Sequence, residues 1–164
     1  MESHPFQQEI QALRNRLSSE GRNAQLRQAS SESLAWLRSM RIPESVVAFY
    51  AVAEPSRWVD IEGLEIGPVA GLKSDNTQAV PGIAASRYGY VVIAKTISGD
   101  AYCLDVNQAD STGQTPVYLV NHEKVGETAT RSDVEAWSRL VTPSFQEFLT
   151  RFIEGDLPYD FDQA

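Results

Sequence analysis

The middle of the chain has three runs of strand-forming residues joined by short connections. Residues 88–97 are rich in β-branched and aromatic side chains, and the turn signal Ser-Gly-Asp at 98–100 leads into a second run at 101–106. A polar loop at 107–114 separates these from a third run at 117–120. Connections this short cannot contain the helical crossover that parallel strands need. The sequence therefore predicts an antiparallel meander.

Alternation along the second run predicts which side chains share a face of this sheet. Tyr102 and Leu104 should lie on one face, and Ala101, Cys103 and Asp105 on the other. Cys103 lies in an apolar strand, so we expect it to be a small core residue rather than a reactive thiol.

Weaker signals precede the meander. Residues 58–61 and 64–66 are short β-like runs around Glu62-Gly63, which predicts a further hairpin. Residues 73–82, KSDNTQAVPG, are rich in turn-forming residues and predict a loop.

The first third of the chain predicts three helices. One face of the first helix is formed by apolar residues at helical spacing, namely Phe6, Ile10, Leu13 and Leu17. Gly21 is expected to end this helix. A second helix is predicted over residues 31–40, and Pro43 suits the first turn of a third, which should end near Pro55.

The last third predicts two more helices. Residues 132–135 have the form of a capping box, and Val134, Trp137, Leu140 and Val141 follow at near-helical spacing. Residues 144–147 offer a second capping box. It opens the clearest helical pattern in the chain, formed by Phe145, Phe148, Leu149, Phe152 and Ile153. Gly155 should end that helix, and the acidic tail after it is expected to be loosely held.

These elements predict an α+β fold, with an antiparallel or mixed sheet of about four to six strands flanked by N- and C-terminal helices. The length of 164 residues suits a single domain over residues 1–164. Within it we expect a helical extension at 1–30, a core at 42–153 and the acidic tail at 155–164. One cysteine, no apolar leader and no run long enough to span a bilayer favour a cytoplasmic protein.

The charge of the chain is unevenly distributed. The net charge is −8, but residues 1–41 carry six arginines against four glutamates, whereas residues 42–164 carry eight basic against eighteen acidic residues. An acidic body repels phosphate backbones, so nucleic-acid binding is disfavoured, and it attracts a basic partner. The alternative is that the acidity serves only solubility.

No established catalytic or metal-binding pattern is found. The two histidines, His4 and His122, form no zinc-ligand spacing with each other or with Cys103, and no phosphate-binding glycine loop is present. Asp100 is expected to form a turn, and His122 to bond a backbone group at a strand end. An enzyme would need His122, Asp100, Asp105 or Glu123 to converge on one cleft, and the sequence places them apart. We therefore expect no catalytic residue, no cofactor and no metal.

The first predicted hairpin offers a candidate surface for binding another protein. Trp58 is an aromatic residue close to three acidic residues, Asp60, Glu62 and Glu65. An aromatic anchor surrounded by acids is a composition suited to a basic partner. The alternative is that Trp58 belongs to the core.

Four motifs, in order and spacing, resemble those of the SMI1/KNR4 (SUKH) family. Ile-Pro-Glu at 42–44 followed by Phe49 resembles the family's first core helix. The segment 98–105, with its Ser-Gly-Asp turn, resembles the family's hairpin, and 116–123, which begins Pro-Val-Tyr and ends His-Glu, resembles its next strand. SFQEFL at 144–149 resembles its closing helix. The resemblance covers about two thirds of the chain.

This resemblance implies an α+β fold and no shared catalytic residue. Its pattern residues imply structural roles and are Pro43, Gly99, Asp100, Asp105, Phe145 and Phe148. Many bacterial members resemble immunity proteins that block the active surface of polymorphic toxins, and fungal members resemble regulatory hubs. The implied function is a non-catalytic immunity protein for a toxin, with a basic toxin domain as the expected partner. The alternative is a regulatory or scaffold protein without a toxin partner, in which the arginine-bearing N-terminal helix docks to another subunit or to a homodimer copy.

Overall fold

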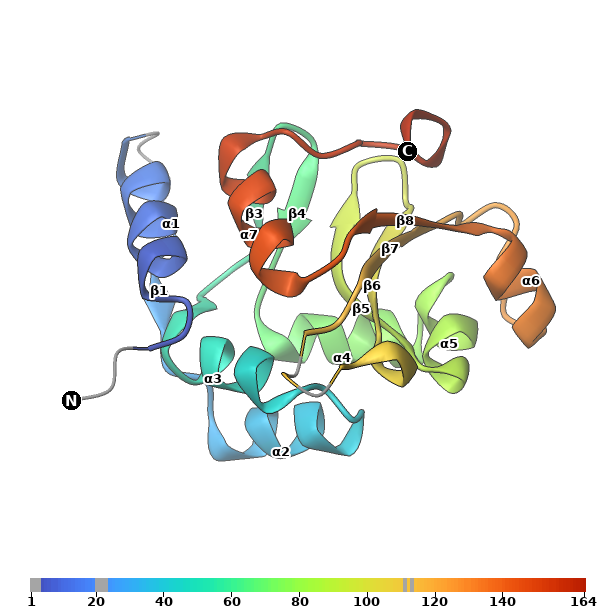
Figure 1. Ribbon diagram of the computed structural model, residues 1–164, viewed down its shortest axis with the longest axis horizontal. Helices are drawn as coiled ribbons and strands as arrows, with labels where there is room; N and C mark the ends of the chain where they lie inside the picture. Colours follow the sequence, from blue (N-terminus) through green and yellow to red (C-terminus); the bar gives the residue numbers. More distant parts are fainter. Residues whose placement is uncertain (1–3, 20–23, 111, 113) are drawn as a thin grey trace.

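A six-stranded antiparallel meander forms the centre of the protein. The computed structural model describes residues 4–19, 24–110, 112 and 114–164. Within them, the strand order is β3-β4-β5-β6-β7-β8, and every neighbouring pair is antiparallel. These strands are β3 (Val59–Ile61), β4 (Leu64–Ile66), β5 (Tyr90–Thr96), β6 (Ala101–Asp105), β7 (Val117–Val120) and β8 (Ser138–Thr142). The predicted meander and the α+β class are confirmed (Figure 1).

Helices and a short second sheet surround the meander. The second sheet pairs β1 (Leu26–Arg27) with β2 (Glu54–Pro55). The α-helices are α1 (Gln7–Ser19), α2 (Ser31–Ser39), α3 (Glu44–Ala53), α4 (Val69–Thr77), α5 (Gly82–Ala85), α6 (Arg131–Ala136) and α7 (Phe145–Glu154). The 3-10 turns are η1 (Ser86–Tyr88), η2 (Val106–Gln108) and η3 (Phe161–Gln163). No helix among the described residues has the length and apolar character needed to cross a bilayer.

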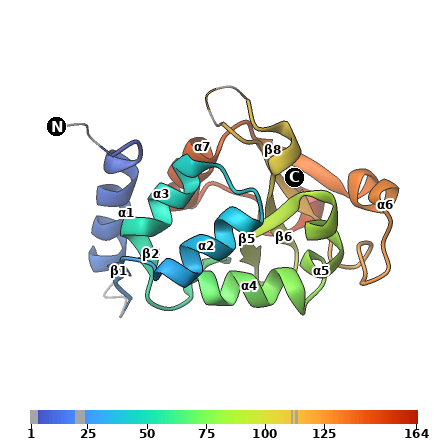
Figure 2. The same cartoon turned by 90° about the horizontal axis from the view of Figure 1, so that it is seen from below.

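The central strands β5 and β6 are buried on both faces of the sheet, and each face belongs to a different core. Tyr102 and Leu104 of β6 lie in the larger core, together with side chains from α1, α3 and α7. Ala101 and Cys103 face a smaller core with residues from α5 and α6. Figures 1 and 2 show α1, α3 and α7 gathered on one side and α5 and α6 on the other. The predicted alternation along β6 is therefore confirmed.

The helix signals near both ends of the chain are confirmed. The four apolar residues predicted for the face of α1 are buried in the larger core. Ser144 caps α7 by accepting a hydrogen bond from Glu147 N, and Gly155 ends it with a φ of 71°. A left-handed residue at this position favours glycine, because it lacks a Cβ. Gly21, the expected end of α1, lies outside the described residues.

The loop predicted for residues 73–82 is wrong, because α4 covers its first half and α5 begins at its end. Asn76, one of the residues that suggested a loop, is buried. Its amide nitrogen donates to the Val92 carbonyl at 3.1 Å, and its amide oxygen accepts from Val92 N at 2.8 Å. These tertiary bonds to β5 outweigh the low helix propensity of asparagine.

The long helix predicted after residue 132 is also wrong. Helix α6 begins earlier, with a capping box between Thr130 and Asp133, and ends at Ala136. The next residues form β8, in which Leu140 pairs with Tyr118 of β7. Near-helical spacing of apolar residues could not distinguish a long helix from a short helix followed by an edge strand.

The C-terminal segment is bound to the domain, contrary to the expectation of a loose tail. Leu157 and Phe161 are buried, and the Tyr102 hydroxyl donates to the Pro158 carbonyl. The Arg139 guanidinium donates to the Phe161 carbonyl at 3.0 Å and lies 4.2 Å from the Phe161 ring. Acidic composition suggested disorder, but alternate apolar residues of the segment are anchored in the fold.

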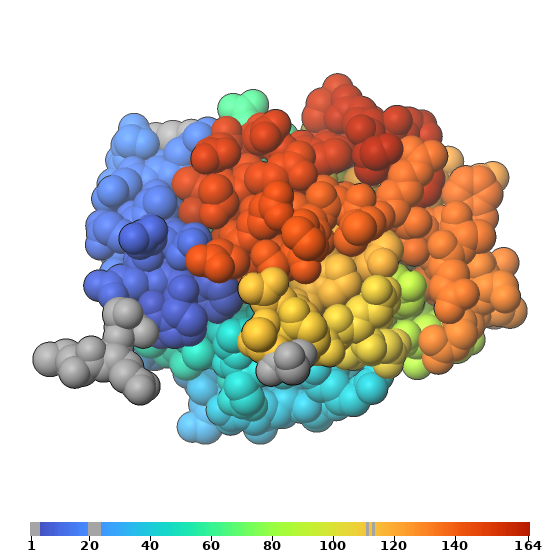
Figure 3. All heavy atoms as spheres, in the orientation of Figure 1, coloured from blue at the N-terminus to red at the C-terminus, as the bar shows by residue number. Residues whose placement is uncertain are grey.

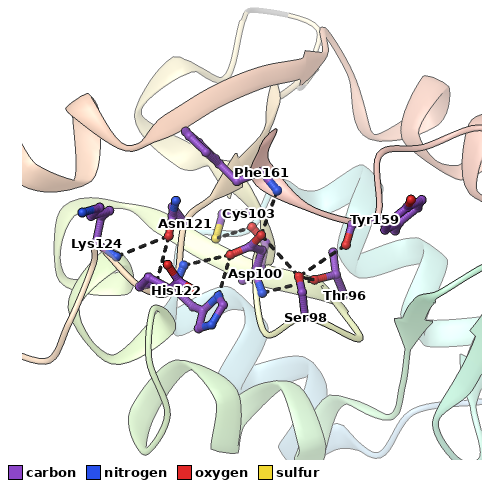
Figure 4. A network of polar contacts seen from close by, with 11 residues as sticks. Thr96, Ser98, Asp100, Cys103, Asn121, His122, Lys124, Tyr159 and Phe161 are labelled. Atoms are coloured by element: carbon purple, nitrogen blue, oxygen red, sulfur yellow. Dashed lines mark hydrogen bonds and ion pairs between the residues drawn. The ribbon is translucent and has the colours of Figure 1, made fainter. Parts of the chain in front are cut away.

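Asp100 joins three segments that are far apart in the sequence (Figure 4). Its Oδ1 accepts hydrogen bonds from His122 N at 3.0 Å and lies 2.7 Å from His122 Nδ1. Its Oδ2 accepts from Phe161 N at 2.8 Å. The residue is only 4% exposed. Burial by itself would raise the pKa of this carboxyl, but the hydrogen bonds from His122 and Phe161 lower the pKa below its ordinary value.

We expect Asp100→Asn to destabilise the protein substantially. The amide would replace one accepting oxygen with a donor that faces N–H groups, leaving buried donors without partners. Loss of such bonds to a charged group should lower the free energy of unfolding by about 2–3 kcal/mol. Urea denaturation measures this, with the exposed Asp162→Asn as a control that should change it by less than about 0.5 kcal/mol. Equal stability of the two variants would contradict the role of Asp100.

The stabilisation that Asp100 provides should depend on pH. The pKa of Asp100 is lower in the folded state than its ordinary value of about 4 in the unfolded chain. Near and below that ordinary value, the folded protein therefore binds fewer protons than the unfolded chain does, and acid favours unfolding. The contribution of Asp100 is therefore present above that value and is lost as the pH falls through the pKa of the folded state. The stability difference between wild type and Asp100→Asn should therefore shrink as the pH falls below about 4 and continue to shrink as it passes through the lowered pKa of the folded state. A constant difference would show that the charge of Asp100 is not what stabilises the site.

Candidate protein-binding site

Two of the four residues predicted for protein binding are direct neighbours on the sheet. Asp60 of β3 lies opposite Glu65 of β4, and Glu65 lies opposite Lys95 of β5. All three alternate with buried residues, so they occupy the face opposite the larger core. We call Asp60, Glu65 and Lys95 the outer row. The sequence did not show that a cation ends this row, because the register between strands could not be derived from it.

Trp58, the proposed aromatic anchor, is half-buried against its own domain. A Cβ built on Gly67 would lie 2.5 Å from the indole, and one on Gly71 would lie 2.7 Å from it. The indole therefore packs directly against the backbone of these two glycines, which have no Cβ in its way. We call this packing site the Trp58 seat. On the ring's face, Lys95 Nζ lies 3.9 Å from the centroid, in cation–π contact. Trp58 is therefore an internal packing residue that Lys95 covers, which favours the alternative considered from the sequence.

Lys95 also lies close to a partly buried carboxylate, that of Asp75. Its Nζ lies 3.9 Å from Asp75 Oδ2, an oxygen that is buried and has no hydrogen-bond partner. Burial raises the pKa of Asp75, the Lys95 ammonium lowers it, and Glu65 raises it further. The sequence missed Asp75 because it lies in the stretch predicted to be a loop.

Glu62 is separated from the other three residues. It lies in the β3–β4 turn with a φ of 51°, and its side chain is 67% exposed. Its carboxylate lies 3.9 Å from the Arg16 guanidinium of α1, and its Cγ would be 2.7 Å from a Cβ on Gly155. Glu62 therefore faces α1 and the end of α7, whereas Asp60 accepts a hydrogen bond from Gly63 N inside the turn.

The structure corrects two expectations about His122, namely that its side chain bonds a backbone group and that it lies apart from Asp100. The His122 side chain instead contacts the Asp100 carboxylate, with 2.7 Å between Nδ1 and Oδ1. The family-like motifs contained both residues, but nothing in the sequence indicated that they pair. Asp105 instead accepts a hydrogen bond from Asn107 N at the start of η2, and Glu123 N donates to the Asn121 side chain. Burial raises the pKa of the Cys103 thiol, which disfavours its reactive form.

No set of three potential metal ligands occurs among the His, Cys, Asp and Glu residues that the structure describes. The remaining motif residues lie where a structural role would place them. Pro43 precedes α3, Gly99 has a φ of 102° in the β5–β6 turn, and the stacked rings of Phe145 and Phe148 belong to the larger core.

The Trp58 seat can be tested by adding one methyl group. Gly67→Ala would place its Cβ 2.5 Å from the indole, so the ring or the backbone must move. We expect a loss of about 1–3 kcal/mol in the free energy of unfolding and a change in tryptophan fluorescence. Gly126→Ala is the matched control, since nothing lies within 4 Å of its Cβ. If both variants unfold at the same urea concentration, the close packing of Trp58 is refuted.

Comparison with known proteins agrees with this architecture. The model of the SMI1 / KNR4 family (SUKH-1) matches residues 29–151, three quarters of the chain, from just before α2 into α7. No curated protein and no solved structure matches at a significant level. The chain therefore belongs to the SMI1/KNR4 (SUKH-1) family.

Proposed function

We propose that this protein is a non-catalytic, cytoplasmic immunity protein that binds a basic toxin domain and blocks its activity. The observation that supports the protein-binding class is the family match over residues 29–151. SUKH domains are typically protein-interacting domains, and those of the immunity type act by covering a partner. The surplus of acidic residues over 42–164 supports a basic partner, because opposite charge accelerates encounter.

The structural contacts of the Asp100 carboxylate also support a binding role rather than a catalytic one. Both carboxylate oxygens of Asp100 accept hydrogen bonds from backbone N–H groups, and one also contacts His122. These contacts fix the fold and lower the pKa of Asp100, so this carboxylate is a poor proton donor near neutral pH.

Capture of the partner is the primary test. The tagged protein should retain one predominant basic protein from its native lysate, released by salt, and the purified protein should abolish that partner's activity at equimolar concentration. Retention of several unrelated cellular proteins, or of copies of the protein itself, would instead favour the regulatory or scaffold function.

Charge reversal tests the electrostatic part of the proposal. The double variant Glu62→Lys, Glu65→Lys should slow association with the captured partner by roughly tenfold at low salt and flatten its salt dependence, because it removes two negative charges from the β3–β4 hairpin and adds two positive ones. Glu32→Lys, Glu127→Lys is the control, with the same change in net charge at exposed positions on α2 and after β7. Equal association rates for the two double variants would exclude the β3–β4 hairpin as the steering surface.

A further inference from the structure

Three segments meet at one end of the meander. They are the β3–β4 turn, the β5–β6 turn and the C-terminal segment, which runs across this end in Figure 1 and forms part of the outer surface in Figure 3. Ile97 N donates to the Gly63 carbonyl at 3.0 Å, which joins the two turns. Ser98 Oγ lies 3.4 Å from the Tyr159 carbonyl, which places the C-terminal segment beside them.

Two large apolar side chains are exposed at this junction. Ile97 is 69% exposed and Tyr159 is 48% exposed. A Cβ built on Gly63 would lie 3.6 Å from Ile97 Cδ1 and 3.5 Å from Tyr159 Cβ, so the two side chains flank this glycine. We call Ile97, Gly63 and Tyr159 the apolar patch. Neither exposed side chain contributes to the cores, so nothing in the fold requires them to be apolar.

The patch is held in place before any partner arrives. Leu157 and Phe161, on either side of Tyr159, are buried, and the Asp100 carboxylate accepts a hydrogen bond from Phe161 N. In Figure 4 the Tyr159 ring points away from the Asp100 network. An aromatic side chain on a backbone that is already ordered loses little conformational entropy on binding, which is characteristic of interface hot spots.

Acidic residues flank the patch along the chain. Residues 154–162 carry four acidic side chains and no basic one. Glu62 adds a carboxylate from the β3–β4 turn next to Gly63. We call these five acidic residues the acidic rim. Three arginines offset this charge only in part. Arg16 and Arg151 form ion pairs of 3.9 Å and 3.7 Å with the exposed Glu62 and Asp156, and Arg139 lies against the Phe161 ring.

We propose that the apolar patch is the docking surface for a basic protein, whose apolar pocket receives Tyr159 and Ile97 while lysine and arginine residues around the pocket face the acidic rim. This rests on the proposed function, from which it takes the basic character of the partner. The charge argues against other occupants. A second copy related by a two-fold axis would bring the acidic rim against itself, and an anionic membrane surface would be repelled.

The test uses isotope-labelled protein and a short peptide of alternating lysine and leucine residues. In an NMR titration, shift changes should concentrate at Gly63, residues 97–99 and residues 156–162. The double variant Ile97→Ser, Tyr159→Ser should raise the Kd at least tenfold, and Tyr159→Phe, which keeps the ring, should bind as wild type. Leu140→Ser is the control, because Leu140 is 59% exposed on β8, opposite Tyr118 of β7, and does not belong to the patch. It should change the Kd less than twofold, and melting temperatures should confirm that all variants fold.

The outcomes distinguish a failure of the docking surface from a failure of the proposed immunity function. Shifts centred on the outer row, no binding of the peptide, or unchanged affinity of the double variant would each overturn the apolar patch as the docking surface. The proposed function would still stand if the native lysate yields a basic partner that the protein inhibits. A folded double variant that loses both the peptide and that partner would support the inference.

Discussion

Strand β6 is buried at every position, and the architecture follows from covering both of its faces. A strand of the meander that is apolar on both sides cannot leave one face to solvent, as many antiparallel sheets do. The larger core therefore recruits α1, α3 and α7 from both ends of the chain, and the smaller core recruits α5 and α6 from its middle and later parts. The N-terminal helix belongs to this scheme, since its apolar face packs into the same core as α7.

Burial of β6 also explains why Asp100 has a central position. The carboxylate lies at the start of the strand, where a buried charge is tolerated only with several hydrogen-bond donors. His122 supplies them from the turn after β7, and Phe161 from the C-terminal segment. One ionised side chain thereby connects residues 22 and 61 positions away and orders the segment that presents Tyr159.

The sequence predicted those features that local pattern determines. The meander followed from short connections, and α7 from its period and cap. The errors occurred where tertiary contacts decide. Asn76 is helical because β5 satisfies its amide, and residues 138–142 form a strand because β7 offers an open edge. At the candidate site, the four predicted residues were neighbours in sequence, but strand alternation and the turn separate Glu62 from the outer row. The covering of Trp58 by Lys95 depended on register, which no local pattern reveals.

The two acidic surfaces differ in what they can contribute to binding. The outer row contains its own cation, and its aromatic neighbour is already packed, so little apolar area remains there for a partner to bury. At the apolar patch, two exposed side chains lie on ordered backbone, and removing them from water supplies affinity that exposed ion pairs cannot. On the proposed function, charge on both surfaces would steer a basic partner toward the protein. The proposal therefore assigns two physical roles, in which the outer row would accelerate encounter and the apolar patch would hold the complex together.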